Sequence, residues 1–508
     1  MKPFAILSAI AVFAGLISSA LLPGAPLKHA PGAQRYTAHY ENVLGTSLEL
    51  KVLAVSETAA DRAETAALAE IDRLARILSA WDAGSEFSRW AGTQGEAVRV
   101  SPELIEMLGL FDQWRERSGG ALDAAAEAIT QVWKRAAAEN RMPRSEELAV
   151  AVAQVKQSHW GLDAERGTAT HLDRTPLALN SFAKSYIVGR AADAVLATEG
   201  VSGTVVNIGG DLVVRGEWTE AVRVADPRSD AENGVPIARL SIRDRAVATS
   251  GNYRRGFEIG GRHYSHIVDP RTGLTAEDVI SATVVAQDAA TAGALATSMS
   301  VLPVEEGRRM AASVPGVEYL LALNDGSRVA SRGWSRLQIA AMPVAAAPEP
   351  AAEAGLWNTA FELTVNLEIA RIQDARARRP YVAVWIEDAD KYPVRTLALW
   401  FDRVRWLPEL KAWYHDDRLR ALAEGNDITG SLSSATRPAG KYKVKWDGKD
   451  NKGALLKAGK YTVCIEASRE HGTYQILRRE VDFNGKAQEI PLQGATELAS
   501  VSLEYGKK

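Results

Sequence analysis

ATSGNYRRGFEIGGRHYSHIVDPRTG, residues 248–273, is the stretch around which we expect the rest of the chain to be organised. Its centre predicts a β-hairpin with Gly260-Gly261 as the turn and residues 262–268 as the return strand. The return strand places Ser265 beside His266, whose imidazole titrates near neutrality and suits general acid or base chemistry. A histidine on a strand is more often a packed or surface residue, so its neighbours must support a functional role.

The composition is that of a globular protein with more than one domain. A chain of 508 residues is too long for one hydrophobic core, and two or three domains are expected. The net charge of −3 gives no indication of nucleic-acid binding. Cys464 is the only cysteine, which excludes an intramolecular disulfide and leaves no cysteine cluster for a zinc or iron–sulfur site.

The N-terminus predicts export. Lys2 precedes an apolar stretch that runs from Phe4 to Leu22. This pattern is typical of a secretory signal, but the stretch is longer than a usual signal core. Residues 1–34 are therefore expected to be a signal peptide or an N-terminal anchor. The rest of the chain would be periplasmic, held at the inner membrane in the case of an anchor.

Hydrophobic patterning divides the exported chain into two bodies. Residues 35–340 alternate strands with amphipathic helices and predict an α+β domain. Residues 341–355 are rich in alanine and proline and predict a linker. Residues 356–508 predict an all-β sandwich. Its expected strands are 360–369, 381–386, 396–401, 440–446, 460–467 and 473–483.

Three local patterns in the first body bear on a site. Lys184 precedes a predicted helix over residues 185–198, where a positive charge is disfavoured unless an anion is bound. Lys184 is therefore either a phosphate ligand or a solvent-exposed lysine. Residues 204–212 predict a strand interrupted by Gly209-Gly210, which indicates a bulge or the close approach of a ligand or another backbone. Residues 36–55 predict one strand.

Several motifs of the first body, taken in order, resemble those of the ApbE family of FAD:protein FMN transferases. The resemblance covers about residues 35–340, and the set is far more specific than any single member. The motifs are Leu44-Gly45-Thr46, Ser85-Glu86, Gly120-Ala121-Leu122-Asp123, Ala183-Lys184, Asn207-Ile208-Gly209-Gly210-Asp211, Thr249-Ser250-Gly251 and SHIVDPRTG at residues 265–273. The second body resembles an uncharacterised domain sometimes fused to these proteins, and is similar to the Ig-like domain of flagellar hook-cap proteins.

The resemblance implies an exported flavoprotein-modifying transferase. In the family, FAD is split at its pyrophosphate, AMP leaves, and FMN is joined by a phosphoester to a Thr or Ser of an acceptor protein. By resemblance, His266 with Ser265 beside it supplies the catalytic base. The implied cofactor-binding residues are Leu44, Trp81, Ala121, Leu122, Asp123, Ala178, Lys184 and Ile267. The implied Mg²⁺ ligands are the Ser181 carbonyl, the residue at Gly293, and Thr297.

Two positions depart from the family pattern. Gly293 stands where the family has the aspartate of its magnesium site, and Ala178 stands where it has a second carboxylate. Without the charged ligand, neutral oxygens should bind Mg²⁺ poorly. Three interpretations stay open. They are a transferase with a weakened metal site, a catalytically weak or inactive FAD-binding or scaffold protein, and an FAD pyrophosphatase that releases FMN and AMP.

Overall fold

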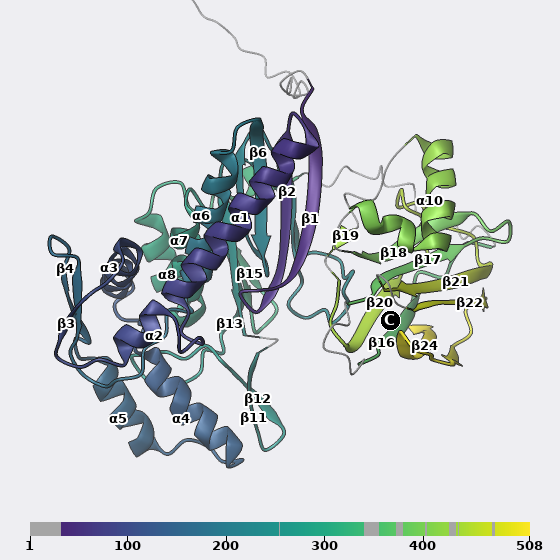
Figure 1. The fold of residues 1–508 in the computed structure, drawn as a ribbon. Helices are drawn as coiled ribbons and strands as arrows, with labels where there is room; N and C mark the ends of the chain where they lie inside the picture. The colour runs from purple at the N-terminus through teal and green to yellow at the C-terminus, as the bar shows by residue number, and fades with distance from the viewer. Residues whose placement is uncertain are drawn as a thin grey trace, which may run out of the picture.

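The chain folds into an α/β part followed by a β-rich part (Figure 1). The computed structural model describes residues 32–252, 255–339, 355–371, 379–401, 404–425, 433–434, 436–469 and 473–508. Each part has its own buried cores, so both expected fold classes are confirmed. Residues 1–31 of the expected signal or anchor and 341–354 of the expected linker lie outside the described residues. Within that description no helix has the length and apolar character needed to cross a bilayer.

An antiparallel sheet of eight strands forms the centre of the first part. Neighbouring strands follow the order β1-β2-β6-β7-β10-β13-β14-β15. Their bounds are β1 (Gln34–Val43), β2 (Thr46–Ala54), β6 (Val201–Ile208), β7 (Asp211–Gly216), β10 (Ala246–Gly251), β13 (Val279–Ala286), β14 (Glu318–Leu323) and β15 (Arg328–Ala330).

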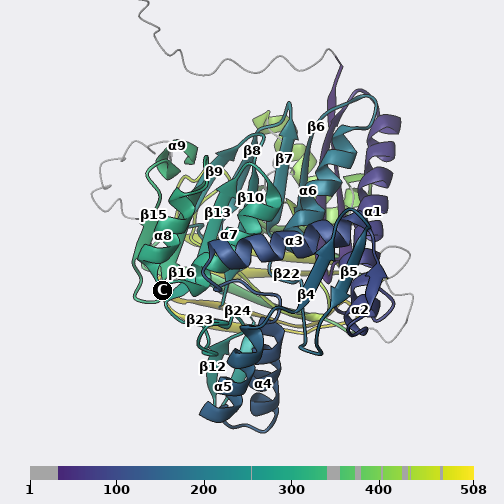
Figure 2. The ribbon, with the colours of Figure 1, turned by 90° about the vertical axis from the view of Figure 1, so that its left-hand side faces the viewer.

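Helices cover one face of this sheet, and smaller elements cover part of the other (Figures 1 and 2). On the first face, α1 (Glu57–Leu78), α6 (Ala183–Leu196) and α7 (Ala289–Val301) pack together, with α8 (Val304–Ala312) beside α7. The Asp288 carboxylate caps α7 by accepting from the Thr291 N–H, because the first N–H groups of a helix lack internal partners. The opposite face carries β8 (Glu220–Val224), β9 (Ala238–Ile242) and α9 (Trp334–Leu337).

The hairpin expected in residues 248–273 is confirmed. Strands β11 (Gly256–Ile259) and β12 (Arg262–Ser265) pair across the turn Gly260-Gly261, whose φ angles of 59° and 77° suit glycine. Strand β12 ends at Ser265, so His266 lies just beyond it and not within it as expected. The remaining elements of the first part are α2 (Glu86–Ala91), β3 (Ala97–Arg99), α3 (Pro102–Arg117), α4 (Ala126–Ala138), α5 (Ser145–Val155), β4 (Trp160–Asp163) and β5 (Thr168–His171).

Two predictions of single strands were wrong, because each segment is a hairpin. Residues 36–55 turn at Leu44-Gly45, with φ angles of 50° and 75°. Residues 204–212 turn at Gly209-Gly210, with φ angles of 57° and 96°. The close approach expected at these glycines is confirmed, because the Gly209 N–H donates to the Ser47 carbonyl at 3.0 Å.

The second part contains two sheets, and all six predicted segments are strands in it. The sheets run β20-β16-β24-β23 and β19-β18-β17-β21-β22. The strands are β16 (Phe361–Ile369), β17 (Tyr381–Glu387), β18 (Pro393–Trp400), β19 (Ser433–Ser434), β20 (Gly440–Trp446), β21 (Gly459–Ser468), β22 (Tyr474–Phe483), β23 (Gln488–Leu492) and β24 (Leu498–Lys507). The all-β expectation omitted η1 (Val404–Glu409) and α10 (Lys411–Glu424). The Ig-like resemblance stays a prediction.

Candidate functional site

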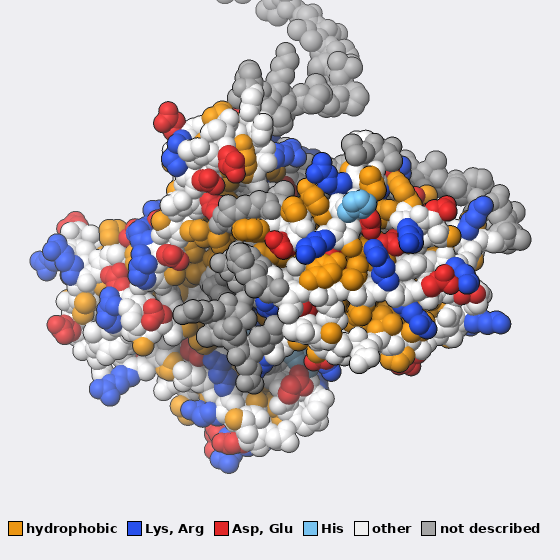
Figure 3. All heavy atoms as spheres, turned by 45° about the vertical axis from the view of Figure 1, so that its right-hand side comes forward, with side chains coloured by type: hydrophobic (Ala, Val, Ile, Leu, Met, Phe, Trp, Pro, Cys, Tyr) orange, Lys and Arg blue, Asp and Glu red, His pale blue; other side chains and the backbone are white. Residues whose placement is uncertain are grey.

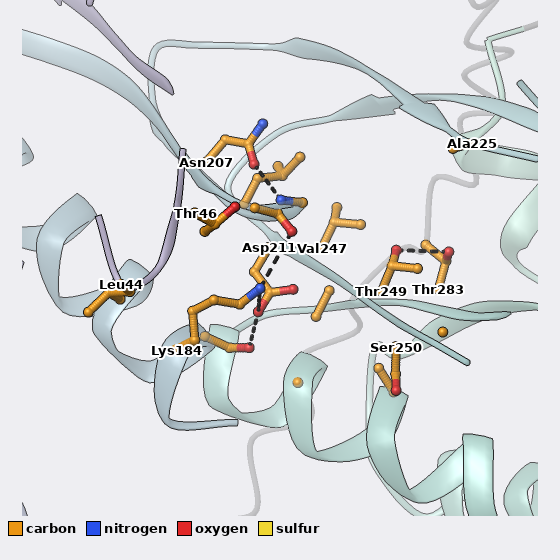
Figure 4. A pocket seen from close by; sticks show the side chains of 18 of the residues that line it. Leu44, Thr46, Lys184, Asn207, Asp211, Ala225, Val247, Thr249, Ser250 and Thr283 are labelled. Atoms are coloured by element: carbon orange, nitrogen blue, oxygen red, sulfur yellow. Dashed lines mark hydrogen bonds and ion pairs between the residues drawn. The ribbon is translucent and has the colours of Figure 1, made fainter. Parts of the chain in front are cut away.

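One cavity of about 3020 Å³ gathers residues that are far apart in the sequence (Figure 4). The turn between β1 and β2, the segment after α1, the start of α6, strand β10 and helix α7 all line it. Every expected site residue except Ser265 belongs to this lining, namely Leu44, Trp81, Ala121, Leu122, Asp123, Ala178, Ser181, Lys184, His266, Ile267, Gly293 and Thr297. The cavity continues to the second part of the chain, where Arg395 and Lys452 line it.

Leu44 and Trp81 offer apolar surface to this cavity. Leu44 has a φ of 50°, a left-handed conformation that is uncommon for leucine and persists here because the β1–β2 turn imposes it. Trp81 follows α1 and is 77% exposed. The ammonium of Lys134 lies 5.6 Å from the Trp81 ring centroid. An exposed indole beside a cation is a suitable platform for an aromatic ring of a nucleotide.

The segment around Asp123 forms a fixed wall of the cavity. The Asp123 carboxylate accepts from Arg115 Nε at 2.8 Å and from the Ala125 N–H at 2.8 Å. Burial raises the pKa of this carboxyl group, and the guanidinium opposes that effect. The Ala178 N–H donates to the Ala124 carbonyl at 2.9 Å, which holds the segment before α6 against the same wall. Asp123 is therefore committed to protein partners.

Lys184 lies in the first turn of α6 and forms an ion pair with Asp211. Its Nζ is 3.3 Å from Asp211 Oδ2 and 3.5 Å from the Gly209 carbonyl oxygen. The Ser185 hydroxyl donates to the same Oδ2 at 2.8 Å. Figure 4 draws Lys184 and Asp211 pointing toward one another. The Asp211 carboxylate thus offsets the unfavourable position of the Lys184 charge at a helix N-terminus. A phosphate bound in the cavity would share the Lys184 ammonium with Asp211.

Ser185 explains why position 293 is a glycine. A Cβ atom on Gly293 would lie 2.3 Å from Ser185 Oγ and 3.1 Å from Phe182 Cβ. Such distances are too short for any side chain unless Ser185 moves. The two other expected ligands bond to each other, since Thr297 Oγ1 donates to the Ser181 carbonyl at 2.9 Å.

These contacts test whether a magnesium ion fits. The three expected positions supply two neutral oxygens and no carboxylate, whereas Mg²⁺ is normally held by at least one carboxylate in proteins. The Asp211 carboxylate, which accepts from Ser185 beside Gly293, is already paired with Lys184. The described residues contain no group of three or more His, Cys, Asp or Glu side chains arranged to hold a metal ion. The residues present therefore do not fit a magnesium site of the expected kind.

His266 has the hydrogen bonding that a general base needs. Its Nδ1 lies 3.0 Å from the Arg255 carbonyl oxygen. A carbonyl only accepts, so Nδ1 carries the proton and Nε2 is left as an acceptor. Burial lowers the pKa of the His266 imidazole, although the bond to Arg255 opposes this. The ring is therefore neutral at neutral pH and able to take a proton.

Ser265 is the expected catalytic residue that the structure places elsewhere. Its side chain is buried, and its Oγ accepts from the Ile267 N–H at 3.0 Å. This bond orients the backbone on both sides of His266. Ser265 and His266 point to opposite sides of the extended segment, and His266 alone of the two lines the cavity, so the structure does not support a catalytic role for the Ser265 hydroxyl.

Sequence reasoning missed Asp211, Ser185 and the lining contributed by the second part. Asp211 had a signal, since it ends one of the motifs, but nothing in the sequence indicates that it pairs with Lys184. The second part has no signal for its role, because its contribution depends on how the two parts pack.

Comparison with known proteins accounts for this arrangement. The ApbE family matches residues 44–321, more than half of the chain. The chain belongs to the ApbE family. A second family, described as a predicted periplasmic protein (DUF2271), matches residues 362–500. The ApbE match thus falls within the α/β part, which holds the expected site residues, and the second match falls within the β-rich part.

Relatives and solved structures agree with the family assignment. An FAD:protein FMN transferase of Rhodobacter capsulatus is 29% identical over 343 residues, covering 66% of this chain and 63% of that protein. An FAD:protein FMN transferase of Klebsiella pneumoniae is 26% identical over 317 residues, covering 60% of this chain and 88% of that protein. The crystal structure of the ApbE protein of Thermotoga maritima matches with a TM-score of 0.54 at 27% identity, covering 60% of this chain and 100% of that one.

Proposed function

We propose that this ApbE-family chain is an FAD:protein FMN transferase that attaches FMN from FAD to a Thr or Ser of an exported acceptor protein and releases AMP. The observation that carries the proposal is the cavity, which brings the expected nucleotide-binding residues together with a neutral histidine. The named function of the relatives supports it. Trp81 and Leu44 would contact the flavin nucleotide, and Lys184 would contact the phosphates.

The chemistry follows from these positions. The acceptor hydroxyl oxygen attacks the phosphorus on the FMN side of the pyrophosphate, and His266 Nε2 takes the hydroxyl proton. The new P–O bond joins FMN to the acceptor, and the bond from that phosphorus to the bridging oxygen breaks. AMP leaves with that oxygen and its electron pair. Lys184 balances charge on the phosphates, released in part from Asp211.

Magnesium binding at the Ser181, Gly293 and Thr297 position is proposed to be weak. Two neutral oxygens that bond to each other supply no charge to hold a divalent cation. In the family the ion would neutralise charge on the transferring phosphate. In this chain, Lys184 and the N-terminus of helix α6 would neutralise that charge.

The site of action is proposed to be the periplasm. The apolar segment after Lys2 supports export, and the description of the DUF2271 family as periplasmic supports the same compartment. An uncleaved N-terminal segment would place the protein at the inner membrane. The acceptor would then be another exported protein.

The test uses the purified full chain with FAD, an acceptor protein containing a flavinylation segment, and magnesium either added or chelated. We expect the intact mass of the acceptor to increase by one FMN and AMP to appear in equal amount. FAD binding without either product would replace this proposal with that of an FAD-binding scaffold protein. Free FMN and AMP with an unmodified acceptor would assign the chain as a pyrophosphatase.

A further inference from the structure

The loop between β8 and β9 attaches the second part of the chain to the first. Its Glu232 N–H donates to the Lys443 carbonyl at 3.0 Å. The Asn233 side chain bonds to the backbone of Lys445 in both directions, at 2.6 and 2.8 Å. Strand β20, which holds both lysines, is the edge of its sheet, so the loop covers groups that an edge would otherwise expose. An ion pair of 2.9 Å between Glu232 and Arg437 adds to the attachment.

Three arginines meet in the cavity beside this attachment. Arg223 and Arg239 are register partners on β8 and β9, and Arg395 comes from β18 of the second part. All three line the cavity. Among the described residues, none of the three forms a salt bridge with a carboxylate. Arg223 and Arg239 are exposed and Arg395 is partly buried, so an anion from solvent can reach all three. Like charges opposite one another on paired strands are destabilising, and a bound anion would relieve this repulsion.

The guanidinium groups have few protein partners. Arg223 Nη2 donates to the Gly234 carbonyl at 3.1 Å, and Arg395 Nη1 donates to the Asp450 carbonyl at 2.7 Å. Arg395 Nε is buried without a hydrogen-bond partner. Burial, and then the charges of Arg239 and Arg395, lower the pKa of Arg223. A buried donor without a partner is costly and points to a ligand acceptor.

The carboxylates nearest to Arg395 are already engaged. Asp447 and Asp450 raise the pKa of Arg395 but do not outweigh burial, which lowers it. Asp447 lies 3.3 Å from Lys449 Nζ, and Asp450 accepts from backbone N–H groups of its own turn. On the face drawn in Figure 3, basic and acidic side chains are interspersed. The unpaired positive charge is therefore local to the cavity and is not a property of that whole face.

The cavity is larger than FAD needs. Small-molecule pockets measure about 300–1,000 Å³, whereas this one measures about 3020 Å³. In Figure 4 the labelled lining residues extend from Leu44 through Asp211 and Val247 to Ala225, the residue that follows β8. The lining is continuous from Lys184 to the arginines, so one bound chain could contact both ends.

We propose that Arg223, Arg239 and Arg395 form an anion-binding site for acidic side chains of the acceptor protein, which holds the acceptor while its hydroxyl reaches the FAD end of the cavity. This inference rests on the proposed function for its occupant. Guanidinium groups bind carboxylates in two-point geometry, and three of them without protein counter-ions suit a segment with several acidic residues. The second part of the chain is thereby a contributor to acceptor specificity.

The first test is a binding experiment that does not depend on transfer. The full chain is titrated calorimetrically with a hexaglutamate peptide and, separately, with inorganic phosphate. We expect hexaglutamate to bind to the natural protein. Arg223→Gln or Arg395→Gln should each lower its affinity about tenfold, which is the contribution of one charge-assisted hydrogen bond. Arg479→Gln, which removes an exposed arginine outside the cavity, should leave binding unchanged. Binding of phosphate alone, or loss of affinity equal in all three variants, would overturn the proposal.

The second test separates the acceptor from the nucleotide. In the transfer assay, Arg395→Gln should raise KM for the acceptor about tenfold, because one charge-assisted hydrogen bond to the acceptor is lost. KM for FAD and the rate at saturating acceptor should each stay within about twofold of the natural protein. A raised KM for FAD would assign the arginines to the nucleotide and overturn the inference. Thermal unfolding of each variant guards against a folding defect. If the chain transfers no FMN at all, the calorimetric result alone decides whether the anion site exists.

Discussion

At the scale of single residues, Ser185 and Gly293 act as a pair. A side chain at position 293 meets the Ser185 hydroxyl, which is itself bonded to Asp211. We predict that Gly293→Asp alone destabilises the protein by about 1–3 kcal/mol through overpacking. It should not strengthen magnesium binding. The combination Ser185→Gly with Gly293→Asp should recover most of the stability and make FMN transfer depend more strongly on Mg²⁺.

Urea unfolding and magnesium titrations of the transfer rate measure both effects. Gly293→Ala is the matched control, because it introduces the same clash without a carboxylate. A Gly293→Asp variant as stable as the natural protein would contradict the steric account. A double variant with unchanged magnesium dependence would show that position 293 is not the origin of the weak site.

His266 gives a prediction for pH. Because burial lowers its folded pKa below the usual 6.5, the ring stays neutral and basic at pH 6.5. Transfer should therefore remain active there and decline only at lower pH, where the imidazole takes up a proton. His266→Gln should reduce kcat by about 10²–10⁴-fold and remove that acidic limb.

The pH profile of kcat/KM from pH 5 to 8 is the measurement. His263→Gln is a suitable control, since His263 lies on the same hairpin but pairs with Glu258 at 2.7 Å and does not line the cavity. That variant should keep the acidic limb, moved slightly to higher pH because the charge of His263 contributes to lowering the pKa of His266. An acidic limb that persists in His266→Gln would assign the base to another group.

The expected site residues could be named from the sequence because their motifs are local. Leu44, Lys184 and His266 each lie in a short pattern that can be recognised without knowing the fold. The Ser185–Gly293 contact could not be foreseen, because it joins two helices that are distant in the sequence. Alternation along the strand indicates that Ser265 and His266 point to opposite sides, but it does not indicate which of the two faces the cavity.

At the scale of elements, helix α4 holds the hairpin that leads to His266. Trp133 of α4 is buried, and its ring centroid lies 5.9 Å from that of Phe257 and 5.5 Å from that of Tyr264. Its Nε1 donates to the Gly273 carbonyl at 2.9 Å. We predict that Trp133→Ala costs about 3–5 kcal/mol and Trp133→Phe about 1–3 kcal/mol, the latter for leaving the carbonyl unpaired.

Chemical unfolding together with the transfer rate tests this role. Trp81→Ala is the matched control, because Trp81 is exposed and should contribute within about 0.5 kcal/mol to stability while weakening FAD binding. Equal destabilisation by the two alanine variants would contradict the assignment of Trp133 to the hairpin support.

The elements that the sequence revealed are those with strong local signals. The β11–β12 hairpin was predictable because Gly260-Gly261 is a typical sequence for its turn. The β1–β2 turn was missed because a leucine at position 44 does not indicate a left-handed φ. Helix α10 was missed because its sequence is highly charged and its N-terminal N–H groups, of Ala412 and Trp413, donate to Glu466 on a distant strand. Such support comes from tertiary structure.

At the scale of the whole molecule, His39 lies where the two parts meet. It belongs to β1, and its ring centroid is 5.4 Å from that of Phe401 in the second part, edge to face. Neither ring nitrogen has a hydrogen-bond partner among the described residues. Burial, with smaller contributions from the charges of Lys51 and Arg437, lowers the pKa of His39 from 6.5 to about 3. The contact between the parts therefore requires a neutral imidazole.

This requirement predicts a loss of stability on acidification. Above pH 6.5 the ring is neutral in both the folded and the unfolded chain, so its full contribution is present. As the pH falls below 6.5, His39 becomes protonated in the unfolded chain but stays neutral in the folded chain, which lowers the free energy of unfolding. This loss of stability grows until the pH approaches 3. At pH 5 it should amount to about 2 kcal/mol, or less if the two parts separate before they unfold.

Unfolding midpoints in urea at pH 5 and pH 7 measure this loss, with tryptophan fluorescence as the signal. His39→Phe keeps an aromatic ring against Phe401 and cannot be protonated, so its midpoint should change less between the two pH values than that of the natural protein. His415→Gln, at an exposed position on α10, should behave like the natural protein. The same pH dependence in His39→Phe would assign the acid sensitivity to another group. It would also show that protonation of His39 does not affect the contact between the two parts.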